Sequence, residues 1–372
     1  MFVKLKGWLQ VWSRQIFKGR YGIVILLVIA AWLGTGCSNA ATAKQDADSL
    51  NTIDKNGQNT IELKYVDFGP YNPSGITGVS KRWADKINEL SNGRVRITTY
   101  WNESLVKQVD QYRAVLSGVA DICFYSIGIN PGLHELNRVF RLPMLGWPSP
   151  EIATDIWEQV WQEFPQLRNE FKGFKVSGTR FQPAYRINTV NKAVRVPSDL
   201  KGMYIACRSE WADALLGAGA FPVETSPADY YITLDKGLVD GQIVSIPISY
   251  VLNLLDLFKY HTMYGDSGVQ MVPDFYLINE NIWNSFPPDI QTVFETASTW
   301  RQQEAMKVDK EEERKGIAYA RDKGNIFVEP DAEEMRLWRE FVEPLHTRWI
   351  AENASRGPAQ SIYDEIRRLI GQ

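Results

Sequence analysis

Residues that build catalytic and metal centres are scarce in this sequence. Its 372 residues include 3 cysteines and 3 histidines, and the histidines (His134, His261 and His346) never stand at the short spacings typical of zinc ligands. The sequence also lacks a Gly-x-Ser-x-Gly turn and a histidine–cysteine constellation, the arrangements that activate a nucleophile. We therefore expect no catalytic residue, no bound metal and no cofactor.

Excess positive charge is confined to the first 20 residues, which carry five basic side chains and no acid. The whole chain has a formal net charge of -3, so removal of this segment would leave -3 - 5 = -8. A chain this acidic is a poor candidate for binding nucleic acid, because phosphate recognition depends on lysine and arginine.

The longest apolar run, residues 23–33, is too short to span a bilayer, which takes about 20 apolar residues. A basic start, a short apolar run and small residues together predict a secretory signal. The segment 33–38 is similar to a lipobox, in which Cys37 would be lipidated after cleavage, although Leu33 stands one place further from the cysteine than usual. Ordinary cleavage after Ala40 is the alternative. Either way, we expect an exported, periplasmic protein, and lipidation of Cys37 would tether it to the membrane.

Residues 38–60 are polar and offer almost nothing to bury, which predicts a flexible tether. The remaining chain is long enough for a large core and two lobes. Cys123 and Cys207 each stand in an apolar, strand-like run, which favours buried free thiols over a disulfide.

Strand-like and helix-like patterns alternate along the chain. Residues 61–66, 95–100 and 120–125 favour strands, whereas residues 79–90 and 106–116 favour helices. This order predicts the α/β class. Further segments expected to be strands are 203–207, 222–223, 239–244, 271–279 and 326–328, and further helices are expected at 151–164, 211–216, 228–236, 332–345 and 362–370.

Residues 289–323 contain no proline and predict one long helix. Its apolar positions, among them Ile290, Phe294 and Ala297, recur at steps of three and four residues. We interpret the dense charge run at 310–315 as a solvated helix face rather than a docking site.

Several short motifs occur in a distinctive order. They are Gly-Val-Ala-Asp-Ile at 118–122, Phe-Arg-Leu-Pro at 140–143, Ser-Asp-Leu-Lys-Gly at 198–202, Leu-Val-Asp-Gly-Gln at 238–242 and Phe-Val-Glu-Pro-Asp at 327–331. Together they resemble the substrate-binding proteins of tripartite ATP-independent periplasmic (TRAP) transporters, of the dicarboxylate-binding type.

The resemblance implies a two-lobed periplasmic binding protein, type II-like, with a long helix that spans both lobes. The lobes would comprise residues 60–181 with 270–308, and residues 182–269 with 309–372. It also implies a receptor that closes on a small organic acid and delivers it to a membrane permease.

Arginines are the expected ligand contacts, because the planar guanidinium stays charged and offers paired donors to a carboxylate. The resemblance places the first ligand arginine about thirteen residues before the Asp-Leu-Lys-Gly turn, which is Arg186 in this sequence. An inter-strand or surface arginine is the alternative interpretation of Arg186, and Arg180 is the reserve candidate.

The sequence departs from the family pattern at two positions. The second family arginine would follow the turn on the next strand, but Ala206 stands there, so Arg208 either replaces it or ends the strand in solvent. Beyond Gln242 the family often has an acid and an asparagine as ligand contacts, whereas this chain has Ile243 and Val244. With Gln242 and Val244 at the site, we expect a monocarboxylate or oxo acid with an apolar body.

Three further positions follow strands whose ends would face the ligand, as in other open α/β sheets. Tyr125 and Ser126 end the strand 120–125, and Phe68 follows the strand 61–66. For Tyr125 and Phe68, packing in the core is an equally simple interpretation.

Two other functional classes remain open. A binding protein for an ATP-driven importer or a sensor kinase would have similar lobes and a different partner. An exported enzyme would need an activated nucleophile or carboxylates with a raised pKa.

Overall fold

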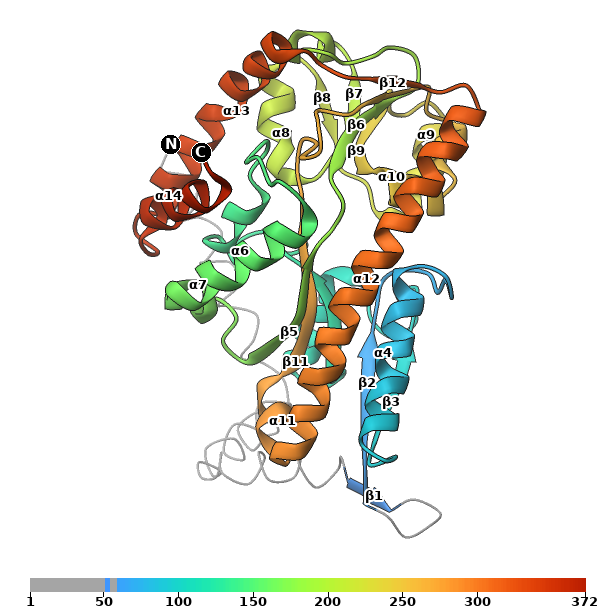
Figure 1. The fold of residues 1–372 in the computed structure, drawn as a ribbon, viewed down its shortest axis with the longest axis vertical. Coiled ribbons are helices and arrows are strands. Elements are labelled where there is room, and N and C mark those ends of the chain that lie inside the picture. The colour runs from blue at the N-terminus through green and yellow to red at the C-terminus, as the bar shows by residue number, and fades with distance from the viewer. Residues whose placement is uncertain (1–50, 54–58) are drawn as a thin grey trace, which may run out of the picture. The chain divides into compact units, whose positions relative to one another are not determined.

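The computed structural model describes residues 51–53 and 59–372, so the predicted signal, Cys37 and most of the predicted tether lie outside the described residues. The described chain forms two six-stranded sheets, each covered by helices, and one long helix runs beside both (Figure 1). The α/β class expected from the sequence is confirmed.

The first sheet has the strand order β1-β2-β4-β11-β5, with β3 paired to β2. β4 and its neighbour β11 are buried along their whole length. In β4, Ile122 and Phe124 point into one core, and Cys123 and Tyr125 into another. A strand buried on both faces requires a continuous apolar run, as the sequence has here. The strands are β1 (Asn51–Ile53), β2 (Asn59–Val66), β3 (Val95–Tyr100), β4 (Ile122–Ser126), β5 (Phe174–Phe181) and β11 (Pro273–Asn279).

The second sheet has the strand order β12-β10-β6-β9-β7-β8. β6 lies between two antiparallel neighbours, and β9 is parallel to β7. Two crossings of the chain, residues 182–184 and 263–272, join this sheet to the first one. The strands are β6 (Tyr185–Thr189), β7 (Tyr204–Ala206), β8 (Phe221–Val223), β9 (Gly241–Ser245), β10 (Tyr260–Thr262) and β12 (Ile326–Val328).

Shorter helices cover the faces of both sheets. On the first sheet, Trp83 and Ile87 of α4 share a core with Phe294 of the long helix. The helices are α4 (Ile76–Leu90), α5 (Gln111–Leu116), α6 (Pro150–Glu163), α7 (Pro165–Asn169), α8 (Ser209–Gly217), α9 (Tyr230–Asp235), α10 (Ile246–Val251), α11 (Glu280–Ser285), α12 (Pro288–Asp322), α13 (Ala332–Asn353) and α14 (Ala359–Ile370). Short 3₁₀ turns occur at Gln108–Asp110, Asn137–Arg141, Pro197–Leu200, Pro227–Asp229 and Leu254–Asp256.

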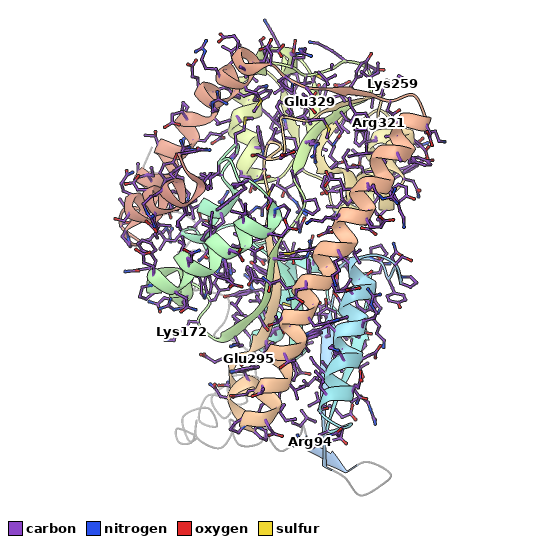
Figure 2. All side chains as sticks on the ribbon, in the orientation of Figure 1. Arg94, Lys172, Lys259, Glu295, Arg321 and Glu329 are labelled. Carbon is purple, nitrogen blue, oxygen red and sulfur yellow. The ribbon has the colours of Figure 1, made fainter. Side chains whose placement is uncertain are left out.

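The helix α12 has 35 residues and is therefore about 50 Å long. It contacts α4 and β5 of the first sheet's layer and α10 of the second sheet's layer; Figure 2 labels Glu295 and Arg321 toward its two ends. Its approach to α10 is close, because a Cβ at Gly316 would lie 2.7 Å from Ile246 Cγ2.

The buried side of α12 is apolar at both ends and carries charged side chains in its middle. Ile290, Phe294 and Ala297 are followed, at the same helical spacing, by Arg301, Ala305, Asp309 and Glu312. An apolar face would suffice to hold the helix on a core, so these buried charges must meet partners or face a cavity.

Most predicted elements are confirmed, including the long helix, the return of residues 271–279 to the first sheet, and the two free buried thiols. The helix expected at 106–116 begins only at Gln111, after a 3₁₀ turn. The strands β5 and β10 were not predicted, and β1 lies within the segment predicted to be a flexible tether.

The predicted division into lobes placed residues 309–372 together. In the structure, however, α14 packs against α6, and Ile362 and Ile366 belong to the same core as Trp157. The last helix therefore lies with the elements of the first sheet.

Candidate ligand-binding site

A cavity of about 210 Å³ lies where strands of both sheets end. Phe68 follows β2, Ser126 ends β4, Arg208 follows β7 and Ser245 ends β9, and all four line it. Ligands of open α/β sheets lie beyond the carboxyl ends of strands, so this is where a ligand site is expected.

Most of the cavity wall is apolar or aromatic. Phe68 and Phe124 meet edge to face, with ring centroids 5.4 Å apart, on the side of the first sheet. The crossing between the sheets contributes Pro183. The other apolar and aromatic lining residues are Pro70, Ile76, Ile129, Tyr185, Pro227, Tyr230, Pro247, Ile248, Val251, Leu252 and Val272.

Three arginines line the cavity, and two of them form ion pairs with acidic side chains of the protein. Arg141 donates to Glu210, and both side chains are at least 92 % buried. Arg180 donates to Asp309 of α12 and lies 2.9 Å from Asp274 of β11, measured from Nη2 to Oδ2. Both guanidinium groups therefore have dedicated internal counter-ions.

The Arg180 cluster extends away from the cavity and holds α12 on the first sheet. Arg301 of α12 is fully buried and lies 3.2 Å from Asp274, while its guanidinium stacks 4.4 Å from the ring centroid of Tyr276. The two arginines and the two acids, Asp274 and Asp309, balance in charge. This cluster is a structural anchor, because removing any member would leave a buried charge unpaired.

Arg208 is the exception among the lining arginines. Its guanidinium makes no hydrogen bond and no ion pair within residues 59–372. Tyr230 first, and then Tyr185, Glu210 and Glu224, raise the pKa of Arg208, so it remains charged. The cavity thus holds a partly buried cation with no counter-ion.

Three acids also line the cavity: Asp67, Asp309 and Glu312. Asp67 accepts hydrogen bonds from the Tyr65 hydroxyl (2.7 Å) and the Gly69 backbone N–H (2.8 Å), and burial raises its pKa to about 6. Burial also raises the pKa of Glu312 to about 7, with Arg180 and Lys315 acting in the opposite direction.

Four of the predicted ligand contacts line the cavity: Phe68, Ser126, Arg180 and Arg208. They come from both sheets. Arg180 is already paired, and the Ser126 hydroxyl donates to the Pro273 carbonyl at 3.2 Å. Within this set, Arg208 is therefore the polar side chain without a partner among residues 59–372, and Phe68 contributes an aromatic surface that packs on Phe124.

Arg186, Gln242 and Val244 do not line the cavity, although their neighbours Tyr185 and Ser245 do. Tyr185 pairs with Ser245 and Arg186 with Val244 in the β6–β9 register. Successive side chains of a strand point to opposite faces, so this second pair lies on the other face. There, Arg186 Nη1 lies 3.0 Å from Glu313 Oε1. The position of Arg186 does not support the predicted ligand contact.

Tyr125 also lies away from the cavity. It is 1 % exposed and packs against Tyr112, His134 and Phe275, and its hydroxyl donates to Asn130 Oδ1 at 3.3 Å. Its place is in the first sheet's core, the alternative that the sequence left open.

Several lining residues were not predicted, above all Arg141, Asp309 and Glu312. Arg141 belongs to the Phe-Arg-Leu-Pro motif that contributed to the resemblance. Asp309 and Glu312 continue the buried stripe of α12, and that spacing was the available signal. The solvated-face interpretation of the charge run holds for Glu311 and Arg314 but is wrong for Glu312, which is 9 % exposed.

Neither a metal site nor a membrane span is evident in the described part of the chain. There, no three or more histidine, cysteine or acidic side chains come together in a way that could hold a metal ion. None of the helices within the same residues is long and apolar enough to cross a bilayer.

Comparison with known proteins identifies the family. Residues 71–353 match the family of bacterial extracellular solute-binding proteins, family 7, known as DctP. The chain belongs to this family. It is similar to the C4-dicarboxylate-binding periplasmic protein DctP of Rhodobacter capsulatus, with 25% identity over 81% of this chain and 88% of that protein. The protein is thus a solute-binding receptor of a family whose members include periplasmic proteins, and the resemblance found in the sequence is confirmed.

Solved structures support the same two-lobed fold. A TRAP periplasmic solute-binding protein from Desulfovibrio salexigens, captured as an open complex, is 26% identical and has a TM-score of 0.70 over 83% of this chain and 95% of that one. A TRAP solute-binding protein from Rhodoferax ferrireducens, in complex with copurified benzoate, is 21% identical and has a TM-score of 0.75 over 84% and 98% of the two chains.

Proposed function

We propose that this DctP-family receptor captures a small carboxylic acid in the cavity beside Arg208 and delivers it to a TRAP-type permease. The observation that carries the proposal is the unpaired guanidinium of Arg208. Every other charged group that lines the cavity, apart from Glu312, has a hydrogen-bond or ion-pair partner among the described residues.

An unpaired, partly desolvated arginine is unfavourable in the empty receptor, because the charge loses hydration and gains no counter-ion. A ligand carboxylate would supply that counter-ion. The guanidinium fork can make two parallel hydrogen bonds to it, which fixes the orientation of the acid as well as its affinity.

The body of the ligand is expected to be apolar. Phe68, Phe124 and Ile129 line one side of the cavity, and Ile248 and Val251 belong to the other sheet's layer. With a single free cation, the lining favours a monocarboxylate or oxo acid over a dicarboxylate. The benzoate found in the similar receptor from Rhodoferax ferrireducens is a ligand of this kind.

Capture would proceed by closure of the two sheets' layers around the acid. Phe68 and Arg208 come from different sheets, so both contact the ligand fully only when the layers approach one another. The crossings at 182–184 and 263–272 and the helix α12 are the connections about which this motion would occur. We propose that the permease recognises the closed form.

The predicted lipidation of Cys37 would keep the receptor at the membrane where the permease resides. Mass spectrometry of protein purified from a bacterial host tests this part. A lipid-modified Cys37 at the new N-terminus is expected, and cleavage after Ala40 without lipid would contradict it.

Two alternative functions differ in their partner or chemistry. A neighbouring gene for an ATPase, in place of a large many-spanning permease, would favour an ATP-driven importer. We expect the protein to return the bound acid unchanged; conversion of that acid would instead identify an enzyme.

A thermal-shift screen against mono- and dicarboxylic acids tests the proposed function. An acid present at a hundredfold its dissociation constant should raise the free energy of unfolding by about 2.7 kcal/mol. We expect apolar monocarboxylates to give the largest shifts. A panel in which succinate gives the largest shift would contradict the ligand class, and a panel without any shift would contradict the receptor.

A further inference from the structure

Arg208 has a counterpart of opposite charge in the same cavity. The Glu312 carboxylate makes no hydrogen bond and no ion pair with any of residues 59–372, although the side chain is only 9 % exposed. The other lining charges are satisfied: Arg141 by Glu210, and Arg180 by Asp309. The cavity therefore offers one free cation and one free acid.

The setting of Glu312 on α12 distinguishes it from the acids beside it. Asp309, one turn earlier, pairs with Arg180 of the first sheet. Glu313, the next residue, pairs with Arg186 of the second sheet at 3.0 Å. Glu312 lies between these two anchors and lines the cavity instead. Among the buried acids of this stretch, Glu312 is the one that makes no ion pair within residues 59–372.

Glu312 lies close to the start of α4. A Cβ at Gly75 would be 3.2 Å from its Oε1 atom, and Gly75, Ile76 and Thr77 also line the cavity. The positive end of the α4 dipole favours an ionised acid here. No backbone N–H of α4 donates to Glu312, however, so the carboxylate oxygens remain available to a ligand.

A buried carboxyl group without a hydrogen-bond partner destabilises the empty cavity. Burial accordingly raises the pKa of Glu312 to about 7. A donor group on the ligand would relieve this cost, whereas an apolar group in the same place would leave it or force the acid to take up a proton.

On the basis of the proposed function, we infer that Glu312 selects carboxylic acids that carry a hydrogen-bond donor on their apolar body. Arg208 binds the carboxylate, and Glu312 accepts from the donor, a hydroxyl or a protonated nitrogen. A site built to accept from a ligand hydroxyl discriminates strongly against the analogue that lacks it, because its own polar group then stays unpaired.

The test compares benzoate with 3-hydroxybenzoate, and phenylacetate with 3-hydroxyphenylacetate, by isothermal titration of the mature receptor. At pH 8, above the pKa of about 7 of Glu312, wild type should bind the hydroxylated acid of at least one pair about tenfold or more tightly, the range of a hydrogen bond to a charged group. Glu312→Leu should abolish this preference and should bind the unhydroxylated acid at least as tightly as wild type.

Glu311→Leu is the matched control, because Glu311 is a half-exposed neighbour on the same helix. It should retain the wild-type preference. Glu312→Gln keeps the shape and one acceptor oxygen, so it should retain a weaker preference if Glu312→Leu folds poorly.

The outcomes separate this inference from the proposed function. Binding of these acids with no hydroxyl preference, or with a preference that survives Glu312→Leu, overturns the role of Glu312 and leaves the receptor intact. Equal weakening of all four acids by Glu312→Leu indicates instead that Glu312 pairs with Arg208 on closure, and also overturns it. If no carboxylic acid binds wild type, both proposals fail.

Discussion

Truncation of Arg208 separates ligand binding from folding more sharply than any other change in the cavity. In the structure its guanidinium has no partner among residues 59–372, so Arg208→Ala breaks no ion pair and strands no buried acid. We expect the free energy of unfolding without ligand to change by less than about 1 kcal/mol, the lost packing of the side-chain stem being the main cost.

The loss of affinity should be large. Two hydrogen bonds from a guanidinium to a carboxylate, at about 1.5 kcal/mol each as a lower bound, together contribute about 3 kcal/mol. That corresponds to a rise in Kd of about a hundredfold. An acid that stabilises wild type by about 2.7 kcal/mol would then stabilise Arg208→Ala by only about 0.4 kcal/mol at the same concentration.

Arg180→Ala provides the contrast, because Arg180 lines the same cavity but is paired with Asp274 and Asp309. Its removal leaves buried acids without a counter-ion and should lower the free energy of unfolding by about 3–5 kcal/mol. Urea unfolding with and without the best acid, together with isothermal titration, measures both effects.

Two results would refute this reasoning. If Arg208→Ala binds the acid within a few fold of wild type, the unpaired guanidinium is not the ligand contact. If Arg208→Ala unfolds in the absence of ligand, the premise that the Arg208 guanidinium has no stabilising partner within the protein is wrong.

Three further predictions concern Arg186, Gly316 and Glu312. Arg186→Ala should destabilise the fold, because it removes the partner of Glu313. It should change the Kd of the acid by less than about threefold in titration, since Arg186 does not line the cavity. A hundredfold loss of affinity would restore Arg186 as a ligand contact. Gly316→Ala should lower stability in urea by about 1–3 kcal/mol, because its Cβ would meet Ile246 Cγ2 at 2.7 Å; unchanged stability would mean that α10 and α12 separate easily. The pKa of Glu312 is about 7 in the folded protein and near 4.5 in the unfolded chain, so the free energy of unfolding should fall as the pH rises across this range. Glu312→Gln removes this titrating group and should reduce the fall. Identical pH profiles of the two proteins would contradict the raised pKa.

The fold was predictable where periodicity is strong. Residues 289–323 show the long helix plainly, because Ile290, Phe294 and Ala297 repeat at helical spacing and no proline interrupts them. The strand Tyr260–Thr262 was missed because three residues are too few to show alternation. The longer strand Phe174–Phe181 was missed because Ser177, Gly178 and Thr179 interrupt its apolar pattern.

The candidate site was only partly predictable, since it depends on which face of a strand each residue occupies. Arg186 and Tyr185 are adjacent in sequence, yet only Tyr185 lines the cavity. A shift of one residue moves a side chain to the opposite face, and the strand boundaries that decide this are not visible in a single sequence. For Arg208 the sequence left two interpretations open, a ligand contact or a solvent-exposed strand end, because its distance from the Asp-Leu-Lys-Gly turn departs from the family pattern.

Glu312 illustrates a different limit. Every residue of the run 310–315 is charged, and three successive residues are glutamates, so only helical phase separates Glu312 from the half-exposed Glu311. That phase could be traced from Ile290, but a buried acid contradicts the usual expectation that charge marks the solvated face. The structure explains this burial, because Glu312 lines the cavity.

A crystal structure of the receptor with the acid that gives the largest thermal shift tests the central claim most directly. We predict the ligand carboxylate within hydrogen-bond distance of the Arg208 guanidinium, with its body between Phe68 and the residues of α10. A carboxylate bound instead to Arg186, or an acid outside this cavity, would contradict the account.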